Sequence, residues 1–376
     1  MSKKLKACIC GLGKHARHSW LNNIKKHPDF ELKCIIDTDT EMLGHVETIT
    51  KGQVTDAHAY RKISEMLRFE DKPDLMVVAT PIYNHHVMIK QAMDAGINVI
   101  CEKNMASTIY QGKQMLQLAL DNPELSTAMG TQRRYATKHW TAKKYLEEDS
   151  EIGDLNFIQW NDAFNWGLYR EDWRQWLQEL FAEDQMIHWF DLLRWITGLN
   201  IVQVRADTFI PRGIDWQGSS TVMANIALAH PDDYQHRHNW VWCRFYGDWR
   251  RLGPRDVMTD LKEFCGNKGK FRIHNTWGLR TWLYENEKGD SWEEDGYMPR
   301  HDIAGLSEEI GGKYTGQMII LEQMKRSIES KGKNQPDNNF RDVFKSFAAV
   351  MGAIQSSRNG KAIFVPDYWK HMDIEY

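Results

Sequence analysis

Short apolar runs alternate with amphipathic stretches through the first third of the chain, as they do in βαβ units. Such units build a parallel sheet that is covered by helices on both faces. The predicted strands are residues 5–10, 32–36, 75–79, 98–101 and 126–129. The predicted helices include residues 87–95, which stop at Gly96, and residues 110–120, which follow the capping residues Ser107 and Thr108. The pattern ends near Gln132, so we expect a Rossmann-type α/β domain over residues 1–132.

Beyond this point the apolar runs become longer and fewer helical patterns separate them. The predicted strands are residues 157–164, 202–209, 222–229, 240–245 and 270–273, and the predicted helices are residues 182–197, 316–330 and 340–357. Strands grouped in this way predict an α+β domain with a mostly antiparallel open sheet over residues 133–376. Residues 284–300 are rich in Asp and Glu, and we expect them to form a solvated excursion.

Composition narrows the class of protein. The chain has 376 residues, 48 Lys and Arg against 51 Asp and Glu, and a net charge of −3, which gives no case for nucleic acid or an anionic membrane as partner. The apolar stretch at residues 5–9 is too short for a signal peptide or a membrane span, so we expect a cytoplasmic protein. The six cysteines lie mostly in apolar runs and imply no disulfide framework. The 16 Trp residues suit either a large core or rings that stack on sugars.

A glycine-rich turn lies between the first predicted strand and the first helix. Its candidate cofactor-binding residues are Gly11, Gly13, Lys14, His15 and Ala16. In a dinucleotide-binding turn the first glycine allows the tight bend, the second lets the backbone approach the pyrophosphate, and the third position packs helix against strand. Asp37 ends the second strand, where a carboxylate accepts bonds from ribose hydroxyls and repels a 2′-phosphate, so we favour NAD over NADP. The alternative is an ordinary strand-to-helix turn with Asp37 as a surface carboxylate.

Three further motifs resemble the Gfo/Idh/MocA oxidoreductases, a family named after glucose-fructose oxidoreductase, inositol dehydrogenase and a rhizopine-catabolism protein. They are Thr80-Pro81 with His85, Cys101-Glu102-Lys103 after a strand, and a helix that carries Asp184 and His188. The resemblance implies cofactor contacts by Thr80, Pro81, His85, Glu102 and Lys103, and association as a homo-oligomer, either a dimer or a tetramer. Asn104 stands where the family has proline, which restores an N–H and no longer fixes φ.

Lys103 follows the carboxyl end of a strand, where ligands bind in open parallel sheets. Its charge would stabilise an alkoxide as the hydride leaves, whereas the alternative is a solvated loop lysine. Asp184, His188 and Asp191 share one face of a helix that is otherwise apolar nearly all round. Since histidine has an unperturbed pKa of about 6.5, we expect His188 to act as the acid/base. Asp184 would orient the substrate or the imidazole, and Asp191 would be a structural partner.

The segment between Asn165 and Trp176 is dense in aromatic residues and arginine. Its candidate substrate-binding residues are Trp166, Tyr169, Arg170 and Arg174, because flat rings stack on the C–H face of a sugar and a guanidinium binds hydroxyls or anions. A surface loop pinned by aromatic side chains would explain the same residues. His230, His236 and His238 show no spacing diagnostic of a metal, and hydride transfer needs none, so we expect no metal site.

Together these features predict an NAD-dependent oxidoreductase that transfers a hydride between a hydroxyl carbon of a sugar or sugar derivative and the nicotinamide. The expected partner is a small sugar or glycoside. An alternative is an NAD-dependent glycosidase, in which the hydride is borrowed and then returned. A non-catalytic NAD-binding protein is disfavoured, because Lys103, Asp184 and His188 are all present.

Overall fold

The computed structural model describes residues 3–55, 58–166, 173–251, 259–274, 278–284, 292–297, 316–370 and 372. The contacts between Cα atoms divide the chain into two compact units. The first unit comprises Met1–Gln132 and Leu306–Phe344, and the second comprises Arg133–Gly305 and Lys345–Tyr376. Each unit is described by itself below.

The first unit is built on a six-stranded sheet with the strand order β3-β2-β1-β4-β5-β6. The strands are β1 (Leu5–Cys10), β2 (Phe30–Ile36), β3 (Ala59–Tyr60), β4 (Leu75–Val78), β5 (Asn98–Cys101) and β6 (Thr127–Met129). All five pairings between neighbours are parallel. The order reverses between β1 and β4, and ligands of such sheets bind beyond the carboxyl ends of the strands at this point. The prediction of a Rossmann-type α/β domain is confirmed.

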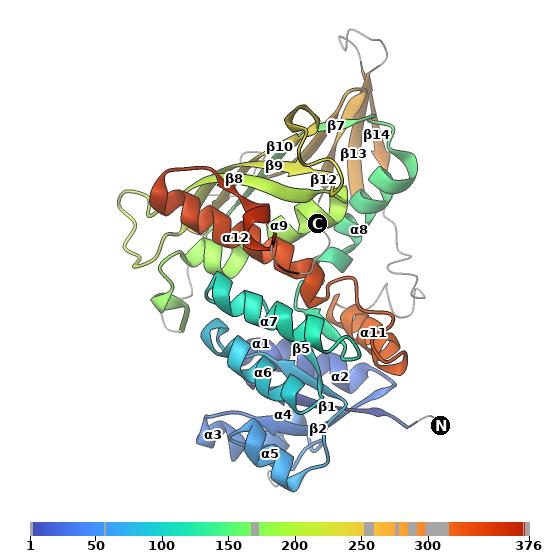
Figure 1. Ribbon diagram of the computed structural model, residues 1–376, viewed down its shortest axis with the longest axis vertical. Coiled ribbons are helices and arrows are strands. Elements are labelled where there is room, and N and C mark those ends of the chain that lie inside the picture. The colour runs from blue at the N-terminus through green and yellow to red at the C-terminus, as the bar shows by residue number, and fades with distance from the viewer. Residues whose placement is uncertain are drawn as a thin grey trace. The chain divides into compact units, whose positions relative to one another are not determined.

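Helices connect these strands (Figure 1). They are α1 (Lys14–Ala16), α2 (Asn22–Lys26), α3 (Thr40–Leu43), α4 (Val46–Thr50), α5 (Ile63–Phe69), α6 (His85–Asp94), α7 (Ile109–Asp121) and α11 (Gly316–Glu329), with a π-helical segment, Arg17–Leu21, between α1 and α2. The caps follow the sequence signals: the Thr108 hydroxyl accepts a bond from the Gln111 N–H at the start of α7. Gly96, at φ 69°, follows the end of α6.

A segment far along the chain completes the first unit. The edge strand β6 would otherwise leave backbone N–H groups without partners. The Thr127 N–H instead donates to the side chain of Gln335 at 3.1 Å, across 208 residues, and the Met129 N–H donates to the Asn338 carbonyl at 2.9 Å. This segment therefore belongs to the first unit, although the expected division at residue 132 assigned it to the second domain.

The second unit is built on a nine-stranded sheet with the order β14-β13-β12-β11-β7-β10-β9-β8-β15. The strands are β7 (Leu155–Ala163), β8 (Asn200–Phe209), β9 (Thr221–Ala229), β10 (Val241–Asp248), β11 (Asp260–Gly266), β12 (Gly269–His274), β13 (Gly278–Tyr284), β14 (Trp292–Tyr297) and β15 (Ile363–Phe364). Neighbours pair antiparallel except β7 and β10, which are parallel. The prediction of an α+β unit with a mostly antiparallel sheet is confirmed.

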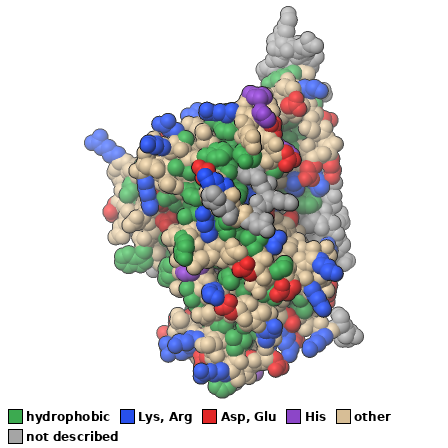
Figure 2. All heavy atoms as spheres, in the orientation of Figure 1, with side chains coloured by type: hydrophobic (Ala, Val, Ile, Leu, Met, Phe, Trp, Pro, Cys, Tyr) green, Lys and Arg blue, Asp and Glu red, His purple; other side chains and the backbone are tan. Residues whose placement is uncertain are grey.

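Three helices accompany this sheet. They are α8 (Thr137–Lys144), α9 (Ile187–Thr197) and α12 (Phe340–Asn359), whose first turn belongs to the first unit. Helix α8 contacts β12 and β13, and α9 contacts β8 (Figure 1). Within the described ranges, the structure holds no helix with the length and apolar character that a membrane crossing requires. On the face drawn in Figure 2, Lys and Arg side chains are interspersed with Asp and Glu side chains.

Two strands differ from the sequence-based expectation. Strand β14 lies within residues 284–300, so the prediction of a solvated excursion is wrong there; charged side chains are typical of an edge strand. Strand β11 was not predicted because its inward-facing Lys262 interrupts the apolar alternation. This lysine is 4% exposed and pairs with Asp260 and, at 3.7 Å, with Asp162 of β7. Ion pairing therefore compensates for the burial of its charge.

A buried ion-pair network anchors α9 in the second unit. Arg134 donates two bonds to the Asp191 carboxylate, at 2.7 and 2.5 Å, and both side chains are 1% exposed. The Ser346 hydroxyl of α12 donates to the same carboxylate at 3.1 Å and accepts from Arg194 at 2.7 Å. Asp191 is thus the structural partner that the sequence indicated.

Replacing Asp191 by Asn should destabilise the protein by about 3–5 kcal/mol, because Arg134 would keep a buried charge without its counter-ion. Urea unfolding measures this loss. The control is Asp367→Asn, which removes an exposed ion pair with Lys370 and should cost less than about 1 kcal/mol. Equal, small losses in both variants would contradict the assigned role.

Candidate active site

The glycine-rich turn is shaped by two glycines with different environments. Gly11 has φ 92°, and a Cβ there would lie 2.8–2.9 Å from backbone atoms of Ala79 and Thr80, so only glycine fits. A Cβ on Gly13 would meet no atom within 4 Å. The backbone at Gly13 therefore borders open space, as the close approach of a pyrophosphate requires. Ala16 is buried behind the turn, whereas Lys14 is exposed in the first turn of α1.

Asp37 is fixed against the same turn. One carboxylate oxygen accepts a bond from the Leu12 N–H at 2.6 Å, and the other accepts from the Asp39 N–H at 3.0 Å. The side chain is only half-buried. Because each carboxylate oxygen has two lone pairs, both oxygens keep capacity to accept further bonds, such as those from ribose hydroxyls.

Thr80 supplies a direct indication of a missing ligand. It follows β4, the strand next to β1, and its hydroxyl is buried without a hydrogen-bond partner among the residues that the structure describes. Buried hydroxyls are nearly always satisfied by protein, water or ligand. Pro81 comes next and precedes a short helical turn, Ile82–Asn84. With the open space at Gly13 and the held carboxylate of Asp37, these residues fit a dinucleotide.

Glu102 lies behind the turn and is buried, at 5% exposure. Its carboxylate accepts bonds from His15 at 3.0 Å, from the Trp20 indole at 2.7 Å and from the Lys103 N–H at 3.1 Å. Burial alone would raise the pKa of this carboxyl, but His15, Trp20 and the Lys103 charge outweigh it and lower the pKa to about 2. These contacts make Glu102 a positioning residue for the turn and for Lys103.

His85 and Asn104 fix the loop that carries Lys103. The two ring nitrogens of His85 lie 2.8 Å from the carbonyl oxygens of Asn104 and Thr80. Burial lowers the pKa of His85, and the carbonyls oppose this effect. Asn104 is fully buried, its side-chain oxygen accepts from the Met105 N–H at 2.9 Å, and the Lys103–Asn104 peptide bond is cis. His85 thus contacts the loops after β4 and β5.

Asp184 and His188 lie on the buried helix of the second unit. Asp184 is in a π-helical segment, Ala182–Met186, which continues directly into α9 with His188. Isolated π-helical turns occur frequently at functional sites. The two side chains are 3% and 4% exposed. Arg174 donates from Nε to the Asp184 carboxylate at 3.1 Å, which joins a predicted substrate residue to a predicted catalytic residue.

The aromatic segment is only partly described. Tyr169 and Arg170 lie outside the described residues. Trp166 stacks on the fully buried Trp249 with ring centroids 5.5 Å apart, and its N–H donates to the Trp249 carbonyl. These contacts pin Trp166 to the strand end of β10, and a role in substrate binding stays a prediction.

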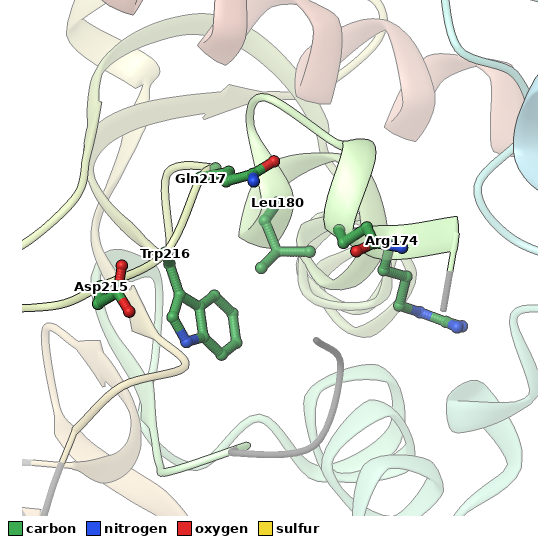
Figure 3. Close-up of a pocket in the computed structure, with 7 residues that line it drawn as sticks. Arg174, Leu180, Asp215, Trp216 and Gln217 are labelled. Carbon is green, nitrogen blue, oxygen red and sulfur yellow. The ribbon is translucent and has the colours of Figure 1, made fainter. Parts of the chain in front are cut away.

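Arg174 also lines a pocket that the sequence did not indicate (Figure 3). The pocket has a volume of about 250 Å³ and is lined by Arg174, Gln175, Leu180, Asp215, Trp216, Gln217 and Gly218. No periodicity or motif relates the two segments, because they lie some forty residues apart in unrelated loops. No group of three or more His, Cys, Asp or Glu within the described ranges is arranged to hold a metal ion.

Comparison with known proteins agrees with this geometry. Residues 5–128 match the model of an oxidoreductase family with an NAD-binding Rossmann fold, Gfo/Idh/MocA. An inositol 2-dehydrogenase of Corynebacterium glutamicum is 25% identical over 210 residues, which cover 54% of this chain and 57% of that protein. The match thus spans little more than half the length of this curated relative.

Two solved structures share the fold. An oxidoreductase from Agrobacterium radiobacter, in complex with NAD+, L-tartaric acid and magnesium, matches with a TM-score of 0.78 at 19% identity and covers 98% of this chain and 100% of that one. An aldose-aldose oxidoreductase from Caulobacter crescentus, complexed with glycerol, matches with a TM-score of 0.74 at 17% identity, over 96% and 100%. The chain belongs to the Gfo/Idh/MocA family of oxidoreductases.

The depressed pKa of Glu102 predicts an acid-sensitive fold. Its ionised form stabilises the native state above the ordinary carboxyl pKa of 4.5, and this contribution is lost as the pH falls towards about 2. The variant Glu102→Gln should show a flatter dependence of unfolding free energy on pH between about 4.5 and 2. The exposed Glu31→Gln is the control. Parallel pH profiles for wild type and Glu102→Gln would refute the assignment.

Proposed function

We propose that this protein catalyses reversible hydride transfer between a hydroxyl-bearing carbon of a sugar or sugar derivative and the nicotinamide of NAD. Membership of an NAD-binding oxidoreductase family supports the reaction type. The names of an inositol dehydrogenase and an aldose-aldose oxidoreductase support a polyhydroxylated substrate. We further propose, from the family resemblance and the composition, a cytoplasmic homo-oligomer.

The observation that carries the carbohydrate assignment is the ion pair between Arg174 and Asp184 beside His188. The pair balances its own charges and keeps guanidinium N–H groups and carboxylate lone pairs for further hydrogen bonds. Hydroxyl groups both donate and accept, so they suit this arrangement. A strongly charged substrate would gain less, because the pair is already neutralised.

Bound NAD would accept the hydride, and its pyrophosphate would be held by the Gly11–Gly13 turn. His188 would take the proton of the reacting hydroxyl as general base. The Lys103 ammonium would stabilise the negative charge that develops on that oxygen. Asp184 would accept a bond from a substrate hydroxyl while Arg174 fixes its carboxylate. In the reverse direction His188 would return the proton.

The glycosidase alternative gains no support, since the relatives and structural neighbours named above are dehydrogenases and oxidoreductases. A screen of polyols, sugars and glycosides for NADH formation by the purified protein tests the proposed reaction. Release of an aglycone without net NADH would favour the glycosidase instead.

Cofactor choice should depend on Asp37. The variant Asp37→Ser should weaken NAD binding roughly tenfold or more, because charge-assisted bonds to the ribose are lost. NADP binding should weaken less or improve, because the repulsion of its 2′-phosphate is removed. Fluorescence titration of NADH and NADPH measures both, with the exposed Asp94→Ser as control. Tighter binding of NADPH than NADH by the wild type would show the assignment to be wrong.

Turnover should depend on His188 and Lys103. The variants His188→Asn and Lys103→Met should each lower kcat by roughly 10²–10⁴-fold, the usual contribution of a positioned acid, base or charge, while the affinity for NAD changes little after His188→Asn. The controls are the exposed His230→Asn and Lys90→Met. Near wild-type kcat in His188→Asn and Lys103→Met would eliminate the proposed site.

A further inference from the structure

We propose that the pocket lined by residues 174–180 and 215–218, here called the Trp216 pocket, binds a second, non-reacting sugar ring. The substrate would then be a disaccharide or another glycoside in preference to a free monosaccharide. This inference rests on the proposed function, because it extends the substrate of the same site.

Backbone hydrogen bonds hold the two walls of the Trp216 pocket together. The Ser219 N–H donates to the Gln178 carbonyl at 2.7 Å, and the Phe181 N–H donates to the Ser219 carbonyl at 3.1 Å. The Trp249 N–H in turn donates to the Ser220 carbonyl at 3.0 Å. The pocket is therefore part of the folded framework. Its volume of about 250 Å³ is close to the lower end of ligand pockets, about 300 Å³, and so suits one ring-sized group.

The lining offers both kinds of surface that a sugar ring needs. Leu180 and the indole of Trp216 provide apolar faces, and Figure 3 shows their side chains directed into the same space. Gln175 and Gln217 provide amide groups that donate and accept. A sugar ring presents C–H faces to the first kind of surface and hydroxyls to the second.

Two buried donors indicate where the ligand's oxygen atoms belong. The indole N–H of Trp216 and the Nε–H of Arg250 are buried and have no hydrogen-bond acceptor among the described residues. The Arg250 guanidinium carbon lies 5.2 Å from the centroid of the Trp216 ring, so the two donors are close together. Unsatisfied buried donors are rare in proteins, and each requires an acceptor oxygen.

Charge in the lining favours a neutral ring over an acidic one. Arg174 is already paired with Asp184, and the lining also contains Asp215, which would repel a carboxylate. Arg250 contributes a positive charge beside Trp216, so the local charges nearly balance. A neutral ring supplies hydroxyl oxygens to the two donors without adding charge.

Arg174 connects the pocket to the candidate catalytic helix. It lines the Trp216 pocket and donates to Asp184, one helical turn before His188. A ring in the pocket would therefore lie next to the hydroxyl that Asp184 receives. Extra contacts to this second ring would supply binding energy that a monosaccharide lacks.

The test compares wild type with Trp216→Phe, which keeps an aromatic ring and removes the N–H. Calorimetry with the NAD-loaded protein measures the Kd of cellobiose, maltose and lactose against glucose, galactose and glucuronic acid. We expect at least one disaccharide to bind more tightly than its monosaccharides, and Trp216→Phe to raise that Kd about 3- to 10-fold. The monosaccharide Kd should not change. The control is Trp176→Phe, at a side chain that is 71% exposed.

Each other result has a defined meaning. Equal or weaker binding of all three disaccharides, or an unchanged Kd in Trp216→Phe, overturns the proposal, as does preferential loss of glucuronic acid binding in this variant. A parallel assay of NADH formation separates the two hypotheses. Disaccharide binding that depends on Trp216 without any NADH formation would contradict the proposed function and leave the pocket assignment standing.

Discussion

A buried carboxylate must be surrounded by donors, and in the first unit Glu102 meets this requirement with groups from two different places. His15 and Trp20 come from the helical stretch after the glycine-rich turn, and the Lys103 N–H comes from the loop after β5. Because the pKa of Glu102 is lowered to about 2, the carboxylate stays ionised and its bonds stay charge-assisted. One side chain thus fixes both the cofactor turn and the loop that carries Lys103.

The second unit applies the same constraint to its helix. Helix α9 is buried nearly all round, so hydrophobic packing alone would tolerate rotation about its axis better than a polar stripe does. The Arg134–Asp191 pair removes this freedom, because any rotation would separate two buried charges. The direction of Asp184 and His188 follows from it. Their shared face therefore has a structural end at Asp191 and a chemical end at Asp184.

Features that depend on neighbouring residues could be predicted from the sequence. Gly11, Asp37 and the polar face of α9 follow from a turn, a strand end and a helical period, and the two fold classes follow from the order of the elements. Features that depend on distant partners could not. Lys262 is tolerated at an inward position of β11 only because Asp162, a hundred residues earlier, pairs with it. Trp216 meets the segment near Arg174 through backbone bonds between two loops, which no pattern encodes.

Asn104 shows how a departure from a family motif can keep the local geometry. A proline at this position would fix φ and present a carbonyl, but it would offer no side-chain acceptor. Here the Asn104 carbonyl contacts His85, while its side chain accepts from the Met105 N–H. Hydrogen bonds therefore supply the restraint that a ring would otherwise give. The orientation of Lys103 consequently depends on His85 as well as on Glu102, so the loop after β5 is held by polar contacts on both sides of the lysine.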